Sequence, residues 1–223
     1  MAKAVRPQHI AIIDPAVRTP ELDCLNAMAQ WSPLPLSYHL PAMFGMRTLE
    51  SFTDSSLKGI VVLGSAASVN DGDDWQVRLT NWLRPRIEAG TPTLALCYGH
   101  QLLAHMFGGH VGFMYPDHTK LKGFRRVDLT EDRLWGAATS GQVVISHAEA
   151  VMTCPVGFRV SGKSTAVAIE AITHETLPAW GFQCHPEATA CFLENQEIAP
   201  PPQENALDFG RQLVKQFLSL ASG

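Results

Sequence analysis

The stretch Thr93-Leu94-Ala95-Leu96-Cys97-Tyr98-Gly99 decides the fold. Residues 93–97 are an apolar run of strand length, and the apolar pattern of residues 102–107 just beyond is helical. A strand that passes through a tight turn into a helix is typical of parallel sheets that alternate with helices. The stretch therefore predicts an α/β fold with Cys97 at the carboxyl edge of a buried strand, where such proteins bind ligands.

The same alternation occurs on the N-terminal side of this stretch. Apolar runs at 9–14 and 59–64 predict two more buried strands, and apolar residues on one face predict helices over 22–31 and 73–89. Pro85 falls inside the second of these helices, so we expect a kink or a break there. These elements predict a mostly parallel central sheet with helices on both faces.

After residue 110 the pattern changes to short strands and turns, which predicts a smaller antiparallel sheet. These strand-like segments are residues 111–129, 143–147, 157–162, 166–173 and 179–184. A linker is predicted at Pro200-Pro201-Pro202, and a last helix over 205–221. A chain of 223 residues is close to the size of one domain, so we expect a single domain over 1–223.

Composition excludes several classes of protein. Hydrophobic residues make up 46% and charged residues 17%, which indicates a globular chain rather than a disordered one. The net charge of -4 gives no basic signature for nucleic acid. No apolar run approaches the roughly 18–20 residues of a membrane span, and the run at 9–14 is too short for a signal peptide. Five irregularly spaced cysteines indicate free thiols and a cytoplasmic location.

Cys97 is the first candidate for chemistry. The turn at Tyr98-Gly99 forces its backbone into a strained geometry, and the glycine gives the helix room to pack. The start of the helix offers free N–H groups and a partial positive charge, both of which favour a thiolate. The alternative is a structural cysteine buried at the end of a strand.

A cysteine nucleophile needs a base, and the base needs a partner that orients it. The segment Gln183-Cys184-His185-Pro186-Glu187 supplies both, because residues two apart in an extended chain point to the same face. The alternative is an exposed strand end. The small residues at 64–70 allow backbone N–H groups to approach a substrate, as an oxyanion hole requires, although an ordinary loop has the same composition.

Together these segments resemble the class I glutamine amidotransferases. The resemblance rests on Ala95-Leu96-Cys97-Tyr98-Gly99-His100-Gln101, on Trp180-Gly181-Phe182-Gln183-Cys184-His185-Pro186-Glu187 and on the loop at 64–69. Residues 146–151 and 155–158 are similar to the segment between nucleophile and base in GMP synthase-type amidotransferase domains. The resemblance implies a three-layer flavodoxin-like fold.

The resemblance also implies the roles of individual residues. It implies a catalytic triad of Cys97, His185 and Glu187, and an oxyanion hole made by the N–H groups of Ser65 and Tyr98. The residues that it implies for substrate binding are Gly64, Gln101, Ser146 and His147. The chain departs from the family pattern in two places: Ala95 stands where the family usually has glycine, and Gly64-Ser65-Ala66 stands where it usually has Gly-Gly-Pro.

The expected function is hydrolysis of the side-chain amide of glutamine to glutamate and ammonia through a cysteine thioester. We expect no cofactor and no metal, since the chain has no His-Glu-x-x-His and no Cys-x-x-Cys. A synthetase that uses the ammonia would be a separate polypeptide. The alternatives are a γ-glutamyl peptide or amide hydrolase, and a catalytically weak regulatory binding module on the same fold.

A basic cluster is the last candidate feature. Lys120, Lys122, Arg125 and Arg126 bring four positive charges into seven residues. The ordinary interpretation is the solvated face of a strand. The functional alternative is a candidate docking surface for an acidic partner or an anionic ligand.

Overall fold

The computed structural model describes residues 7–51, 54–201 and 203–223. The first six residues, and Pro202 of the predicted linker, lie outside the described residues. The first half of the chain forms β1 (His9–Ile13), α1 (Leu22–Trp31), β2 (Leu36–His39), α2 (Pro41–Phe44), α3 (Arg47–Glu50), a 3-10 turn (Asp54–Ser56), β3 (Leu57–Val62), α4 (Asp74–Glu88), β4 (Thr93–Leu96) and α5 (Tyr98–Met106).

The second half of the chain is mostly strand. It forms β5 (His110–Phe113), β6 (Leu121–Leu129), β7 (Thr139–His147), β8 (Glu149–Thr153), β9 (Phe158–Lys163), β10 (Ala171–His174), β11 (Ala179–Phe182), α6 (Ala190–Asn195) and α7 (Asp208–Leu220). The predicted change of pattern after residue 110 is therefore confirmed.

One large sheet organises the fold. Its nine strands follow the order β2-β1-β3-β4-β11-β10-β9-β6-β7. The strands from β2 to β11 pair in parallel, and those from β11 to β7 pair antiparallel. Within the described ranges, β5 and β8 form a second, separate antiparallel sheet. The predicted α/β class is confirmed, but most of the antiparallel strands extend the main sheet instead of forming a second one.

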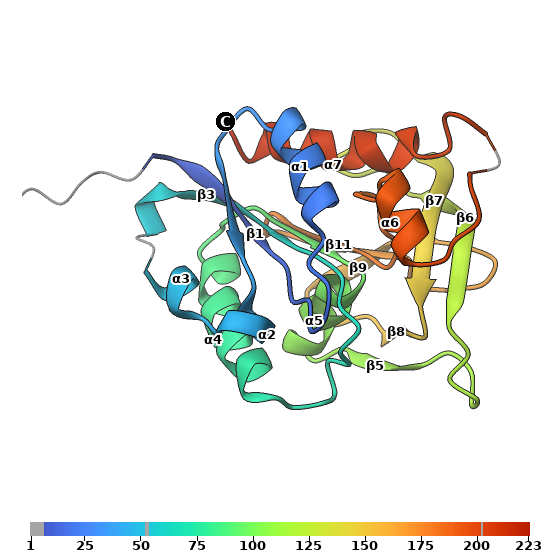
Figure 1. The fold of residues 1–223 in the computed structure, drawn as a ribbon, viewed down its shortest axis with the longest axis horizontal. Coiled ribbons are helices and arrows are strands. Elements are labelled where there is room, and N and C mark those ends of the chain that lie inside the picture. Colours follow the sequence, from blue (N-terminus) through green and yellow to red (C-terminus); the bar gives the residue numbers. More distant parts are fainter. Residues whose placement is uncertain (1–6, 52–53, 202) are drawn as a thin grey trace, which may run out of the picture.

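Helices cover both faces of the sheet (Figure 1). On one face α1, α6 and α7 bury side chains such as Met28, Phe192 and Phe217 against the sheet. On the other face α4 and α5 bury residues such as Leu83 and Leu102. Each face of the sheet therefore has its own apolar core, and the predicted three layers are present.

Helix α4 runs without interruption from Asp74 to Glu88, so the predicted break at Pro85 is absent. Pro85 lies in the last turn of the helix, where its missing N–H leaves a single carbonyl unpaired. Beyond it the bonding continues, because Ala89 N donates to Pro85 O at 2.9 Å. The Arg86 guanidinium also donates to Trp82 O at 2.8 Å.

Among residues 7–51, 54–201 and 203–223, no helix combines the length and the apolar character needed to cross a membrane.

The close packing of α5 against the sheet requires a glycine at position 99. A Cβ at this position would lie 2.4 Å from the carbonyl oxygen of Val62, a main-chain atom that cannot rotate away. Gly99→Ala is therefore expected to lower the free energy of unfolding by about 1–3 kcal/mol, as overpacking does. The measurement is urea denaturation followed by circular dichroism. His105→Ala, an exposed change on the same helix, is the control and should stay within about 0.5 kcal/mol of the parent.

Candidate functional site

Cys97 occupies a strained turn between β4 and α5. Its backbone has φ 48 and ψ -103, a conformation that residues other than glycine rarely adopt. The turn is held from both sides, since Cys97 N donates to Phe182 O at 2.8 Å and Gln101 N donates to Cys97 O at 3.0 Å. The strand, the turn and the helix therefore fix the position of this cysteine, as the sequence predicts.

The Cys97 thiol is nearly enclosed, with 4% of the residue exposed. Its Sγ lies 4.0 Å from Ser146 O and accepts a long contact of 3.9 Å from Gln183 Nε2. Gly64 passes close in front of it. A Cβ at Gly64 would lie 3.6 Å from Cys97 Cβ and only 2.7 Å from Cε1 of His185. A residue without a side chain is therefore required between the cysteine and the histidine.

His185 and Glu187 lie side by side just beyond the end of β11. His185 Nδ1 bonds Glu187 Oε1 at 2.9 Å, and both residues are buried. The segment is tied to the sheet, because His185 N donates to Val144 O at 2.8 Å. The spacing in the sequence predicts this pairing on a common face, and the structure has it.

The electrostatic surroundings of His185 favour the imidazolium. Burial alone would lower the pKa of this histidine. The negative charges of the Cys97 thiolate and the Glu187 carboxylate outweigh burial, so the pKa is raised. Within the described part of the chain, His185 Nε2 and Glu187 Oε2 are buried without a hydrogen-bond partner. The His185 ring also interacts with the Cys97 thiol, and this interaction contributes to the raised pKa of His185.

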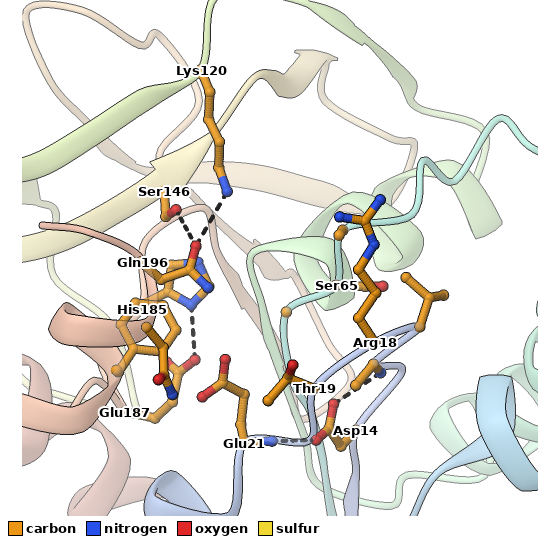
Figure 2. A pocket seen from close by; sticks show the side chains of 16 residues that line it. Asp14, Arg18, Thr19, Glu21, Ser65, Lys120, Ser146, His185, Glu187 and Gln196 are labelled. Atoms are coloured by element: carbon orange, nitrogen blue, oxygen red, sulfur yellow. Dashed lines mark hydrogen bonds and ion pairs between the residues drawn. The ribbon is translucent and has the colours of Figure 1, made fainter.

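A cavity of about 360 Å³ lies beside this pair. Its walls come from the segments that follow β1 and β3, from the start of β6, the end of β7, the end of β11 and α6 (Figure 2). The lining residues include Asp14, Arg18, Thr19, Glu21, Gly64, Ser65, Lys120, Ser146, His185, Glu187 and Gln196. Cys97 is not part of this lining, but Gly64, which lines the cavity, lies next to Cys97 and to His185.

The two predicted oxyanion donors come from two segments near the cysteine, since Ser65 follows Gly64 and Tyr98 follows Cys97. Ser65 lines the cavity, and its hydroxyl donates to Pro15 O at 2.7 Å. Tyr98 is the first residue of α5, where a backbone N–H has no partner within the helix. Among the described residues, the N–H groups of Ser65 and Tyr98 donate to no other protein group. Both are therefore available to an oxyanion, and that role stays a prediction.

The four predicted substrate-binding residues divide into two pairs. Gly64 and Ser146 line the cavity. Gln101 is not among the lining residues, and its Nε2 donates to Glu149 O at 2.8 Å. His147 bonds the same carbonyl through Nδ1 at 3.0 Å, and its burial lowers its pKa to about 4. Gln101 and His147 thus hold the neighbouring main chain, and their roles toward a substrate stay predictions.

The basic cluster does not form one surface. Adjacent residues of a strand point to opposite faces. Arg125 is therefore turned inward, where it forms a buried ion pair of 2.7 Å with Glu170. Lys120 reaches into the cavity and donates to Gln196 Oε1 at 3.2 Å. Lys122 pairs instead with Glu197 at 3.3 Å. The predicted single docking surface is therefore wrong.

The segment after β1 is the part of the site that sequence analysis missed. Asp14 is fully buried, and it accepts bonds from Ala16 N at 2.9 Å, from Glu21 N at 2.8 Å and from the Tyr38 hydroxyl. Burial, followed by the charge of Glu187, raises the pKa of Glu21 to about 7. The signal that was available is the place of Asp14 directly after a parallel strand, at the carboxyl edge of the sheet.

No group of three or more histidine, cysteine or acidic side chains in the described ranges is arranged to hold a metal ion.

Comparisons with known proteins identify the type of domain. Residues 42–196 match the family model of glutamine amidotransferase class-I. The glutamine-hydrolyzing GMP synthase of Wolinella succinogenes is 33% identical over 155 residues, which cover 66% of this chain and 29% of that protein. A subunit of the glutamine-hydrolyzing GMP synthase of Pyrococcus furiosus is 33% identical over 130 residues, which cover 58% of this chain and 66% of that subunit. The chain thus spans less than two thirds of either relative's length.

A solved structure extends the likeness to the whole fold. A putative GMP synthase subunit from Thermoplasma acidophilum superimposes with a TM-score of 0.73, over 98% of this chain and 96% of that one, at 16% sequence identity. The resemblance predicted from the sequence motifs is confirmed by the family match, and the predicted fold is confirmed by this superposition.

The surroundings of the five thiols predict their order of reaction. Burial raises the pKa of Cys24, Cys154 and Cys184, and a hydrogen bond to Asp23 raises that of Cys191. Cys97 instead stands on the strained turn at the start of α5, beside His185, a base that can take its proton. Limiting iodoacetamide at neutral pH should therefore modify Cys97 first, as read by peptide mass spectrometry. His185→Ala should slow that modification. Equal labelling of all five thiols would contradict the assignment.

Proposed function

The chain belongs to the class-I glutamine amidotransferase family, and we propose that it hydrolyses the side-chain amide of glutamine with Cys97, His185 and Glu187 as the catalytic triad. The observation that carries this proposal is the buried His185–Glu187 pair, 2.9 Å apart, next to a cysteine held on a strained turn. A nucleophile, a proton carrier and a group that orients the carrier are the three parts that covalent amide hydrolysis needs.

The first half of the reaction forms a thioester. The Cys97 thiolate attacks the side-chain carbonyl carbon of glutamine, and the carbonyl oxygen becomes an oxyanion. The His185 imidazolium then gives its Nε2 proton to the amide nitrogen, which leaves as ammonia. Glu187 holds the ring through Nδ1, so that Nε2 is the nitrogen that faces the reacting group.

The second half returns the enzyme to its starting state. The neutral His185 takes a proton from water, and the resulting hydroxide attacks the thioester. Glutamate leaves, and the Cys97 thiolate again faces an imidazolium. The N–H groups of Ser65 and Tyr98 stabilise the oxyanion in both halves, and one such donor is worth about 2.7–4 kcal/mol in the transition state.

The ammonia in this proposal is used by a synthetase on a separate polypeptide. The support comes from the relative in Pyrococcus furiosus, which is named as one subunit of a glutamine-hydrolyzing GMP synthase. The cavity next to His185 is the place where ammonia is released, and its rim would face such a partner.

The direct test of this function is glutamate release from glutamine by the purified chain. Cys97→Ala should abolish release, because no nucleophile remains, and should leave the circular dichroism spectrum unchanged. Cys154→Ala removes a thiol outside the cavity lining and serves as the control, with full activity expected. Activity that survives in Cys97→Ala would contradict the assigned nucleophile.

Glu187 and His185 should differ in how much they contribute. Glu187→Gln keeps a side chain that holds the ring but removes its charge, so turnover should fall while Cys97 still reacts with a glutamine-like affinity label. His185→Ala removes the proton carrier, and turnover should fall further. The measurements are initial rates of glutamate release and intact mass after labelling. Parental turnover in both variants would overturn the triad.

If the chain depends on a partner, the rate of glutamine hydrolysis by the isolated chain should be low. A free glutaminase wastes glutamine, so the isolated chain is expected to turn glutamine over slowly while its Cys97 is labelled at a normal rate. A chain that is already fast on glutamine when alone would contradict dependence on a partner. A chain that is slow on glutamine and fast on γ-glutamyl peptides would identify a γ-glutamyl hydrolase instead.

A further inference from the structure

Glu21 is a carboxylate in the cavity that the proposed mechanism does not use. It lies at the N-cap of α1, where its N–H donates to Asp14 Oδ2 at 2.8 Å and its carbonyl accepts from Leu25 N at 3.1 Å. Its main chain is therefore fixed. The side chain extends from this anchor into the cavity, between the His185–Glu187 pair and Thr19 (Figure 2).

The Glu21 carboxylate has no cationic side chain to balance it. None of the ion pairs among the described residues includes it, and its single side-chain contact is a long one of 4.0 Å from the Cys24 thiol. The charged groups that act on it are Glu187, His185, Asp14 and Asp23, three of which are acidic. Burial, followed by the charge of Glu187, holds the pKa of Glu21 near 7, well above the usual range of a carboxyl group.

The permanent cations of the cavity lie elsewhere. Arg18 belongs to the same segment as Glu21, but its side chain runs beside Ser65, and Lys120 descends from the top of the cavity to Gln196 (Figure 2). The cavity thus carries negative charge at Glu21 and positive charge at Arg18 and Lys120. A ligand that carries both an ammonium and a carboxylate complements this distribution of charge.

We propose that Glu21 is a specificity-determining residue that binds the α-ammonium group of the substrate. This inference rests on the proposed hydrolysis of glutamine, whose only cationic group is its α-ammonium. The α-carboxylate of the same substrate would meet Arg18 or Lys120, the two permanent cations of the cavity. Binding of an ammonium also supplies the positive charge that the acidic side of the cavity lacks, and a charge-assisted hydrogen bond of this kind is strong.

The test compares glutamine with 4-carbamoylbutanoate, which is glutamine without its α-amino group. The parent chain should prefer glutamine in kcat/KM by about ten- to a hundredfold, the worth of one charged hydrogen bond. Glu21→Gln keeps the shape of the side chain and removes its charge. It should lower kcat/KM for glutamine by that factor, mainly through KM, and leave the rate on 4-carbamoylbutanoate unchanged.

Glu204→Gln is the matched control. Glu204 is an exposed acidic residue that does not line this cavity and does not act on Glu21. Its substitution removes the same charge from the chain, so the preference for glutamine should stay at the parental value. A loss of preference in this control would mean that net charge, and not contact with Glu21, sets the selectivity.

A binding measurement separates this inference from the proposed function. Glutamine and 4-carbamoylbutanoate are titrated by calorimetry into Cys97→Ala and into Cys97→Ala combined with Glu21→Gln, neither of which can form a thioester. Tighter binding of glutamine to the first variant alone supports the role of Glu21, even if the parent chain hydrolyses nothing. Hydrolysis of glutamine by the parent, without this preference, supports the function and overturns the inference.

Three results would overturn the role of Glu21. Equal losses on both substrates in Glu21→Gln would mean that the residue acts on the triad and not on the ammonium. Unchanged kinetics on both substrates would mean that it contacts neither. A parental preference for a γ-glutamyl amide of a diamine, lost in Glu21→Gln while the preference for glutamine over 4-carbamoylbutanoate stays, would place the cation on the leaving group instead.

Discussion

The parallel pairing of β4 with β11 is the contact on which the rest of the candidate site depends. Leu96 lies opposite Phe182 in this pair, so both strands end at the same edge of the sheet. Cys97 follows directly after one of them, and the segment with His185 follows directly after the other. Groups far apart in the sequence therefore meet without a dedicated loop to join them. Shifting this register by one residue would turn the pairing partners to opposite faces and separate them.

Much of the fold and of the candidate triad can be predicted from local sequence. The strand, turn and helix around Cys97 are encoded by local hydrophobic patterns and turn residues, without reference to segments far away in the sequence. The two-residue spacing of His185 and Glu187 is enough to place them side by side. Burial of Arg125 against Glu170 could not be predicted, because it depends on pairing between strands. The role of the segment after β1 was missed for a similar reason, since only the assembled sheet brings Glu21 next to Glu187.

The cavity is built by two separate parts of the chain. The segment that matches the family, residues 42–196, contains the three proposed triad residues. The wall with Asp14, Arg18 and Glu21 precedes that segment, yet it closes the same cavity. The proposed catalytic residues and part of the wall of the cavity thus come from two different segments of the chain. Each stretch is anchored by a strand of the same sheet, β1 for the first and β4 for the second.

The strained backbone at Cys97 has a consequence for the divergence of this fold. A residue other than glycine in such a conformation costs on the order of 1–3 kcal/mol, a sizeable share of the stability of a typical domain. The strained turn adds nothing to stability, so the advantage that maintains it under selection is the reactivity of the thiol. In a gene copy that has lost catalysis, selection on stability alone favours glycine at this turn. Glycine at position 97 would therefore distinguish descendants that only bind ligands from those that still react with them.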